Sequence, residues 1–403
     1  MELPLKGVRV LDIAQVLAGP FGAAMLGDLG ADVIKIEPLR GDESRYLGPG
    51  SGRAADSAMF VGANRSKRGL ALDLACEEGV AVFHRLLKDA DIVVDNLRPA
   101  AKEKLGVDYP ALKAVNPAII AVNVSAFGNS GPYAGRPGID PLAQALGGFM
   151  DITGERGGAP LKSGAAVVDG TTAHLVVIAA LSALRQRDQS GEGQLVEVNL
   201  LEGMLNLQPT IVSQLTVSDY IPPRVGCGSD LISPYGCFEC ADGTYLQLVG
   251  LNDKFFVNIC AALEREAWVS DSRFSTQAQR LENNAELEAL VAQRVLEKSA
   301  SAWMELLVAH DVMAAPVKSM RESLADPQVQ HNGLLQEVDH ARLGPLQNAT
   351  LPVKFGGCGG SNPPVTAAPA LGEHSRTVLA EAGLAESEID TLLAAGVVAT
   401  ADL

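Results

Sequence analysis

Asp169 is the acidic residue whose surroundings could support carboxylate chemistry. It lies between the apolar residues 165–168 and a long segment rich in Ala, Val and Leu. A carboxylate can attack an acyl carbon and form a covalent intermediate. The ordinary role for an aspartate at a helix start is to cap the helix, which contributes about 1 kcal/mol. The residues alone favour the cap, although the two roles are compatible because a helix N-terminus stabilises negative charge.

Basic side chains in the first third of the chain could bind phosphate groups. They are Arg40, Arg65, Lys67, Arg68, Arg98, Lys102 and Lys104. Taken one at a time, each is better explained as an ordinary solvated surface residue. As a set they follow neighbouring strands of the expected sheet. We therefore predict that they form a phosphate-binding rim along one edge of that sheet.

Several motifs with well-understood chemistry are absent from the sequence. Residues 15–20 read Gln-Val-Leu-Ala-Gly-Pro and lack the glycines of a dinucleotide-binding turn, and there is no Walker A lysine. The G-x-S-x-G elbow of serine hydrolases is missing too. His174 follows Asp169 on the same apolar segment, and we interpret it as a packed helix residue rather than a general base.

Cys237 and Cys240 have the spacing of zinc ligands, but only Cys227 lies near them in the sequence. A structural zinc site needs four ligands. Residues three apart in a strand also point to opposite faces. We therefore expect no metal site.

The first half of the chain alternates strand-like and helix-like segments. Strands are predicted at 8–13, 33–36, 70–74, 92–94, 119–124 and 195–198, and helices at 21–29, 77–89, 110–115 and 164–187. This alternation indicates βαβ units and a mostly parallel sheet. Ligands of such sheets bind beyond the carboxyl ends of the strands. The segments to inspect are therefore residues 15–18, 37–40, 96–98 and 125–128.

The alternation of predicted strands and helices ends after the sixth strand. Residues 235–248 resemble a hairpin about Asp242 and Gly243, and helices are expected at 253–263 and 282–307. We predict a large Rossmann-like domain over 1–212, a small α+β domain over 226–320, and a C-terminal segment, 330–403, that returns to the large domain.

Composition limits the possible partners. The chain has 403 residues, of which 47% are hydrophobic, and a net charge of −16. Such acidity argues against nucleic acid, which is bound by clustered basic residues. The start of the chain lacks the apolar region of a signal peptide, and the apolar run 173–184 is short for a membrane span. We expect a cytoplasmic protein without a membrane partner.

Longer motifs make the sequence similar to the class III, or CaiB/BaiF, coenzyme A transferases, which include formyl-CoA and succinyl-CoA:dicarboxylate transferases. The matching segments are 7–13, 17–20, 26–37, 64–69, 95–99, 128–133, 138–140, 153–154, 190–194, 326–327 and 331–333. Each segment alone is a weak signal, but together they cover nearly the whole chain.

The resemblance implies that Asp169 is a nucleophile. In that family the catalytic aspartate attacks the donor thioester to give a mixed anhydride, and the thiolate returns to form an aspartyl-CoA thioester. An acceptor carboxylate then completes the exchange. The anhydride must be kept from water, and the family covers it with a loop that corresponds here to residues 248–252, with one glycine.

The resemblance also implies a binding site for CoA as a substrate, with no tightly bound cofactor. The corresponding positions are Gln15, Val16, Leu17, Ala18, Arg40, Leu72, Asp73, Leu74, Ala75, Asn96, Leu97, Arg98, Lys104 and the stretch from Arg136 to Asp140. Arg40 is the loosest match, because a basic residue found slightly earlier in some members is Pro38 here. Family members form interlocked homodimers, so the same assembly is expected.

Two alternatives remain beside CoA transfer to a small carboxylic acid. α-Methylacyl-CoA racemases share the fold, but their catalytic histidine corresponds to Ile139, which cannot move a proton. A non-catalytic CoA-binding protein would have no need of the acid at position 169. Within the transferases, the sequence resembles members that use succinyl-CoA and other dicarboxylates.

Overall fold

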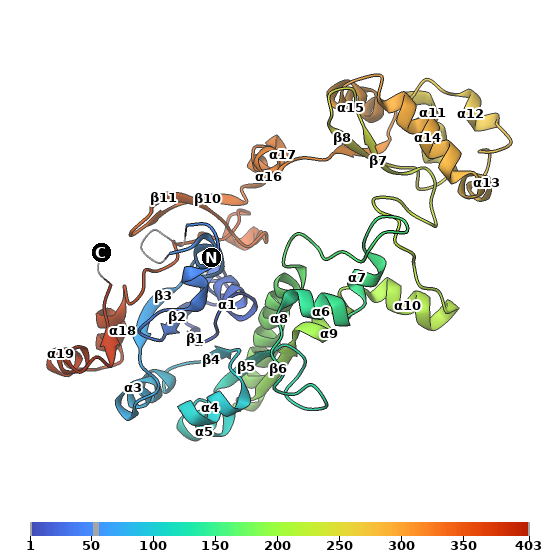
Figure 1. Ribbon diagram of the computed structural model, residues 1–403. Helices are drawn as coiled ribbons and strands as arrows, with labels where there is room; N and C mark the ends of the chain where they lie inside the picture. Colours follow the sequence, from blue (N-terminus) through green and yellow to red (C-terminus); the bar gives the residue numbers. More distant parts are fainter. Residues whose placement is uncertain (1, 51–55, 402–403) are drawn as a thin grey trace. The chain divides into compact units, whose positions relative to one another are not determined.

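The computed structural model describes residues 2–50 and 56–401. The chain divides into two compact units (Figure 1). Unit 1 comprises Met1–Gly147, Gly164–Pro209 and Gln328–Leu403, and unit 2 comprises Gly148–Ser163 and Thr210–Pro327. The prediction placed residues 148–163 in the large domain, whereas their contacts group them with unit 2.

Unit 1 is built on a sheet with the strand order β12-β3-β2-β1-β4-β5-β6. Its strands are β1 (Arg9–Asp12), β2 (Asp32–Glu37), β3 (Arg68–Leu72), β4 (Ile92–Asp95), β5 (Ile120–Ser125), β6 (Leu195–Asn199) and β12 (Val398–Ala399). Neighbours from β3 to β6 pair in parallel, which confirms the predicted parallel sheet. The short β12 was not predicted, and it pairs antiparallel with β3.

Helices cover both faces of this sheet. The helices of unit 1 are α1 (Ala18–Asp28), α2 (Ala58–Ala63), α3 (Glu77–Leu87), α4 (Pro99–Leu105), α5 (Tyr109–Val115), α6 (Asp140–Leu146), α8 (Val167–Ser190), α9 (Leu200–Asn206), α18 (Ser375–Glu381) and α19 (Glu386–Ala394), with 3-10 turns η1 (Glu43–Tyr46) and η2 (Gly356–Cys358). Phe83, Leu112, Leu379 and Ile389 from α3, α5, α18 and α19 share one buried core with the sheet. Figure 1 shows α18 and α19 near β3, although these two helices are far from β3 in the sequence.

Helix α8 packs closely against α1. A Cβ atom at Gly22 of α1 would lie 2.7 Å from the Cβ and Cγ1 of Val176 in α8, so only glycine fits there. By length and apolar composition α8 could span a membrane, but core helices pass the same test. In the structure α8 packs on α1, α9, β5 and β6. It ends at Gly191, whose left-handed backbone terminates the helix.

Unit 2 holds a smaller antiparallel sheet with the order β7-β8-β9. Its elements are β7 (Tyr235–Glu239), β8 (Tyr245–Val249), β9 (Met313–Pro316), α7 (Phe149–Ile152), α11 (Asp253–Ala262), α12 (Ala267–Ser270), α13 (Gln277–Glu282), α14 (Asn284–Val295), α15 (Ala300–Ala309) and α16 (Met320–Leu324). Trp303 is fully buried in its core. Two further helices, α10 (Pro209–Ser218) and α17 (Pro327–Asn332), lie at the unit boundaries.

The hairpin about Asp242 and Gly243 is confirmed, since β7 and β8 pair across it. The single helix predicted over 282–307 is wrong. The chain breaks after α14, and the Ser299 side chain accepts from the backbone N–H of Ala302 to start α15. Strand β9 was missed, as was the hairpin of β10 (Leu335–His340) and β11 (Gly344–Ala349) in unit 1.

Candidate active site

A cavity of about 310 Å³ lies in unit 1 beyond the carboxyl ends of β1, β4 and β5. The strand order changes direction between β1 and β4, and such switch points are where open α/β sheets bind ligands. The cavity is lined by residues 15–18, 96–99, 124–129 and 135–139, together with Asp169 and Leu200. The predicted site residues Gln15, Val16, Leu17, Ala18, Asn96, Leu97, Arg98, Arg136 and Asp169 are thus brought together.

The loops that follow β1 and β4 are hydrogen-bonded to each other at this cavity. Asn96 follows β4, and its side-chain amide donates to the carbonyl oxygen of Gln15 at 2.7 Å. Its Oδ1 accepts from the backbone N–H of Gln15 at 2.8 Å. The loop after β1 is therefore fixed to the loop after β4. Because Gln15 uses its backbone for these bonds, its side-chain amide remains available at the cavity wall.

Asp169 occupies the first turn of α8, which begins at Val167. The predicted capping role is wrong, because the N-cap position is Ala166 and no side chain of that residue caps the helix. Among the residues that the structure describes, nothing donates a hydrogen bond to the Asp169 carboxylate. The side chain is only partly exposed. A half-buried carboxylate without partners is poorly stabilised and suited to reaction.

Asp140, the first residue of α6, caps α8 instead. Its Oδ2 accepts the backbone N–H groups of Val168 at 2.8 Å and Asp169 at 3.1 Å, and Gln144 donates to its Oδ1 at 2.5 Å. Asp140 is buried and does not line the cavity. The residue predicted to contact CoA instead holds the start of α8 in place.

Burial and, to a smaller extent, the negative charge of Asp140 together raise the pKa of Asp169 to about 6. The carboxyl group therefore titrates close to neutral pH. Above that pH it is an ionised and weakly solvated nucleophile.

Two cationic side chains line the same cavity. Neither Arg98 nor Arg136 has an ion-pair partner within residues 2–50 and 56–401, and Arg136 stacks over the Tyr133 ring at 4.1 Å. Guanidinium groups without a carboxylate partner attract anions such as phosphate. The cavity thus combines one unpartnered acid with two unpartnered cations.

Other residues predicted for CoA do not line this cavity. Arg40 is exposed beyond β2, Leu72 is buried in the core, and Lys104 is exposed on α4. Asp73 accepts the backbone N–H of Ala75 in a tight turn after β3, and Leu74 packs against the core. These positions share the carboxyl edge of the sheet with the cavity, because β1 to β5 are parallel.

The predicted basic rim is wrong for most of its members. Lys67 is buried and donates to Asp12, Asn64 and the carbonyl oxygen of Pro20, each at 2.7 Å. Arg65 pairs with Asp28 at 2.6 Å. Arg68 and Lys102 lie near Asp32 and Asp95, respectively. These cations compensate nearby acids, and of the seven only Arg98 reaches the cavity.

Cys237 and His174 are the side chains that the sequence offered for metal binding and for general-base catalysis. The described residues contain no cluster of His, Cys, Asp and Glu that could hold a metal ion. The Cys237 thiol instead donates to Gln247 on the neighbouring strand. His174 is exposed rather than packed, and its ring Nδ1 lies 2.7 Å from the carbonyl oxygen of Gly170.

Comparison with known proteins identifies the family. The model of CoA-transferase family III matches residues 5–375. The chain belongs to CoA-transferase family III. It is 36% identical to the succinate–glutarate CoA-transferase of Agrobacterium fabrum over 387 residues, covering 94% of this chain and 95% of that protein. It is 32% identical to the human succinyl-CoA:glutarate CoA-transferase over 399 residues, covering 98% and 90%.

A solved structure of the family has the same fold. The CaiB/BaiF family protein from Brucella suis matches with a TM-score of 0.86 and 33% identity, covering 95% of this chain and all of that one (100%). This family III enzyme therefore has the predicted α/β architecture.

Sequence reasoning missed part of the cavity wall. Gly135 and Leu200 line it but were not among the predicted contacts, whereas Pro137, Gly138 and Ile139 belong to the predicted stretch 136–140. Gly135 directly precedes the predicted stretch from Arg136 to Asp140, so the glycine- and proline-rich sequence around it was the available signal. Leu200 follows β6, and nothing in its local sequence marks it.

Proposed function

We propose that this family III enzyme moves CoA from succinyl-CoA or another dicarboxylyl-CoA to a small carboxylic acid, with Asp169 as the nucleophile. The observation that carries the proposal is the partly buried Asp169 carboxylate without a partner, in one cavity with Arg98 and Arg136. The names of two similar transferases pair succinyl-CoA with glutarate and with D-citramalate, which supports the substrate class.

The proposed reaction is a series of exchanges at carbonyl carbons. An Asp169 oxygen attacks the donor thioester carbonyl, and the C–S bond breaks to release CoA thiolate and leave a mixed anhydride. The thiolate attacks the aspartyl carbonyl of that anhydride and releases the donor acid as a carboxylate. The acceptor carboxylate attacks the resulting aspartyl-CoA thioester, again releasing thiolate. The thiolate finally attacks the acceptor acyl carbon, which forms the new acyl-CoA and frees Asp169.

We propose that Arg98 and Arg136 bind the anionic part of CoA next to the cavity. The loops that carry Arg40, Leu72, Asp73, Leu74 and Ala75, and Lys104 on α4, would hold the more distant nucleotide end. These segments lie at or beyond the carboxyl ends of β2, β3 and β4, which run parallel to β1 at the cavity. The loop at residues 248–252 remains a proposed cover for the intermediates.

An interlocked homodimer is part of the proposal. Large apolar side chains on α6, α8 and α9 are exposed in a single chain, among them Leu146 at 53% and Ile178 at 59%. Exposed apolar surface of this kind marks protein interfaces. Sedimentation at micromolar concentration should show a dimer, and a stable monomer would contradict this part.

The test of the proposed function is a panel of acyl-CoA donors crossed with dicarboxylate acceptors. We expect exchange with succinyl-CoA and a dicarboxylic acid, and incubation of acyl-CoA with hydroxylamine should leave a hydroxamate on Asp169. A hydroxamate on another residue would place the nucleophile elsewhere. Deuterium entering the α-carbon without acyl exchange would favour racemization, which Ile139 in the cavity wall argues against.

A further inference from the structure

Val16 lines the cavity in a backbone conformation that valine rarely adopts. Its φ angle is 71°, in the left-handed region. For residues other than glycine this conformation costs roughly 1–2 kcal/mol, and β-branched residues there are outliers. Strain of this kind persists at functional sites only where the surroundings hold it.

Three consecutive residues of this loop are each held by a polar side chain. The Lys35 ammonium donates to the carbonyl oxygen of Ala14, and Asn96 holds Gln15 as described above. The Asp42 carboxylate accepts the backbone N–H of Val16, with its oxygens at 3.1 and 3.2 Å. Lys35 in turn donates to Asp42 at 3.0 Å. The strained residue is thus the one that Asp42 contacts directly.

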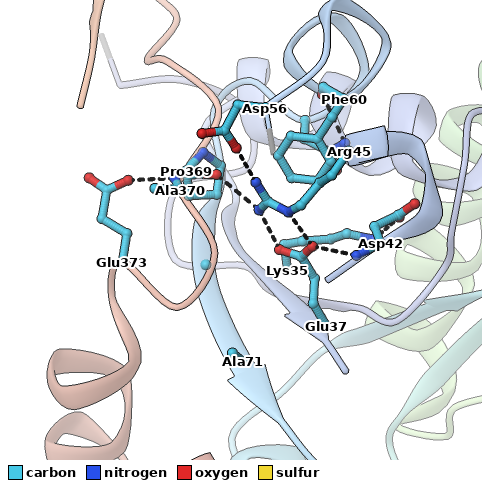
Figure 2. Close-up of polar contacts among 12 residues, drawn as sticks. Lys35, Glu37, Asp42, Arg45, Asp56, Phe60, Ala71, Pro369, Ala370 and Glu373 are labelled. Atoms are coloured by element: carbon cyan, nitrogen blue, oxygen red, sulfur yellow. Dashed lines mark hydrogen bonds and ion pairs between the residues drawn. The ribbon is translucent and has the colours of Figure 1, made fainter. Parts of the chain in front are cut away.

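Asp42 is itself fixed by a buried ionic network (Figure 2). Its backbone N–H donates to Glu37 at 2.9 Å, and Glu37 accepts both Nε and Nη2 of Arg45 at 2.7 Å. Arg45 also bonds Asp56 and reaches the carbonyl oxygen of Pro369 at 3.1 Å. The side chains of Lys35, Glu37, Asp42 and Arg45 are at most 1% exposed. Removing one partner from such a network leaves a buried charge uncompensated, so the network resists rearrangement.

Among the described residues, every hydrogen-bond partner of the Asp42 carboxylate is a donor. The donors are the N–H of Val16, the ammonium of Lys35, and both the N–H and the hydroxyl of Ser44. Burial alone would raise the pKa of Asp42, but Lys35 and Ser44 outweigh it and lower the pKa to about 2. A carboxamide of the same shape would have to turn its NH₂ group toward at least one of these donors.

We propose that Asp42, supported by Lys35, is a positioning residue that holds the 15–17 wall of the cavity in the shape that binds CoA. The inference rests on the proposed function, because it takes this cavity to be the CoA site. Neither side chain lines the cavity. Their effect on CoA therefore passes through the backbone of Val16.

The test is the affinity for CoA, measured by calorimetry, in Asp42→Asn and in the double variant Asp42→Asn/Val16→Gly. Asp42→Asn should raise the Kd about tenfold, equivalent to 1.4 kcal/mol. Glycine adopts φ near 71° without strain, so the double variant should recover most of that loss. A role confined to stability would lower the Tm but leave the Kd of the folded protein unchanged, and that result would overturn the inference.

Asp28→Asn is the matched control. Asp28 is a buried carboxylate paired with Arg65, and it does not line the cavity. It should lower the Tm and leave the Kd for CoA unchanged. An equal rise of the Kd in Asp28→Asn would show a general effect of lost stability and contradict the inference.

Two further variants keep the test decisive. If Asp42→Asn does not fold, Val16→Pro keeps the buried side chains of Lys35, Glu37, Asp42 and Arg45, but it can neither donate an N–H to Asp42 nor adopt a positive φ. Normal CoA affinity in Val16→Pro would overturn the inference. Arg98→Ala reports on the cavity itself, and an unchanged Kd there would contradict the proposed CoA site together with the inference. If Arg98→Ala raises the Kd for CoA and Asp42→Asn leaves it unchanged, only the positioning role of Asp42 is contradicted.

Discussion

Two carboxylates beside the same cavity have opposite environments. Asp42 lies behind the loop that follows β1, surrounded by donors and paired with Lys35, and its pKa is lowered to about 2. Asp169 lies in the first turn of α8 without a partner among the described residues. Burial and the charge of Asp140 raise its pKa to about 6.

The difference separates a carboxylate that builds the site from one that reacts in it. A fully satisfied carboxylate is a poor nucleophile, because its lone pairs are engaged and its charge is stabilised. A carboxylate that is desolvated and faces a like charge is destabilised as an anion, so attack on a carbonyl carbon relieves that cost. Burial alone therefore does not indicate function, but the set of partners does.

The sharpest test of this comparison is the removal of each acid in turn. Asp169→Asn should lower kcat by at least about 10³-fold, since no other carboxylate among the described residues lines the cavity. Asp42→Asn should retain kcat within several-fold. Exchange between succinyl-CoA and a dicarboxylate, followed by chromatography, measures both. Comparable losses of kcat in the two variants would remove the distinction between them.

The unpartnered cations provide the next largest effect. Arg98→Met and Arg136→Met should each raise the KM for acyl-CoA about 10- to 100-fold, the range for losing a charge-assisted hydrogen bond. The wild-type KM should also rise with ionic strength. Lys113→Met, at an exposed position on α5, is the control and should leave KM unchanged. An effect of similar size there would indicate general electrostatic attraction.

The pH profile tests the cause of the raised pKa at Asp169. Because the nucleophile must be ionised, kcat/KM should fall tenfold per pH unit below about 6. Asp140→Asn removes a like charge while its oxygen still accepts the N–H groups of Val168 and Asp169. The acidic limb should therefore move to lower pH. An unmoved limb would assign the raised pKa to burial alone.

The smallest expected effects are on stability, and they have opposite signs for the two acids. Asp42 has a lowered pKa, so its contribution is present above the unfolded pKa near 4 and is lost as pH falls toward 2. Asp169 has a raised pKa, so its ionisation lowers stability as pH rises from 4 through 6. At pH 7.5, Asp42→Asn should lower the Tm and Asp169→Asn should raise it by a few degrees. At pH 4, the Asp169→Asn difference should vanish.

The sequence predicted the strands of the parallel sheet and the place of Asp169, because both depend on local patterns. Apolar runs such as residues 92–94 are fully buried, as a parallel sheet requires. The nucleophilic role of Asp169 came from family resemblance, and its local sequence indicated a cap. The cap is Asp140, which is adjacent only through the packing of α6 on α8.

The roles of the basic residues could not be predicted from the sequence. Lys67 and Arg98 are both cationic, and their local sequences do not distinguish them, but Lys67 compensates Asp12 in the core and Arg98 faces the cavity. That distinction depends on which acid lies opposite in three dimensions. The same limit applies to Val16, whose positive φ depends on Asp42, a residue from beyond the next strand.

The glycine contact between α1 and α8 limits how the cavity can evolve. Gly22 lies one turn after Ala18 at the cavity wall, and Val176 lies two turns after Asp169 on the same face of its helix. The separation of these two helices is therefore set by the absence of a single methyl group, and neither can shift to admit a bulkier acid. Changes in acceptor preference should accumulate instead at Ile139 and Leu200, where the wall has no such constraint. Directed evolution toward longer dicarboxylates should select substitutions there and leave Gly22 untouched.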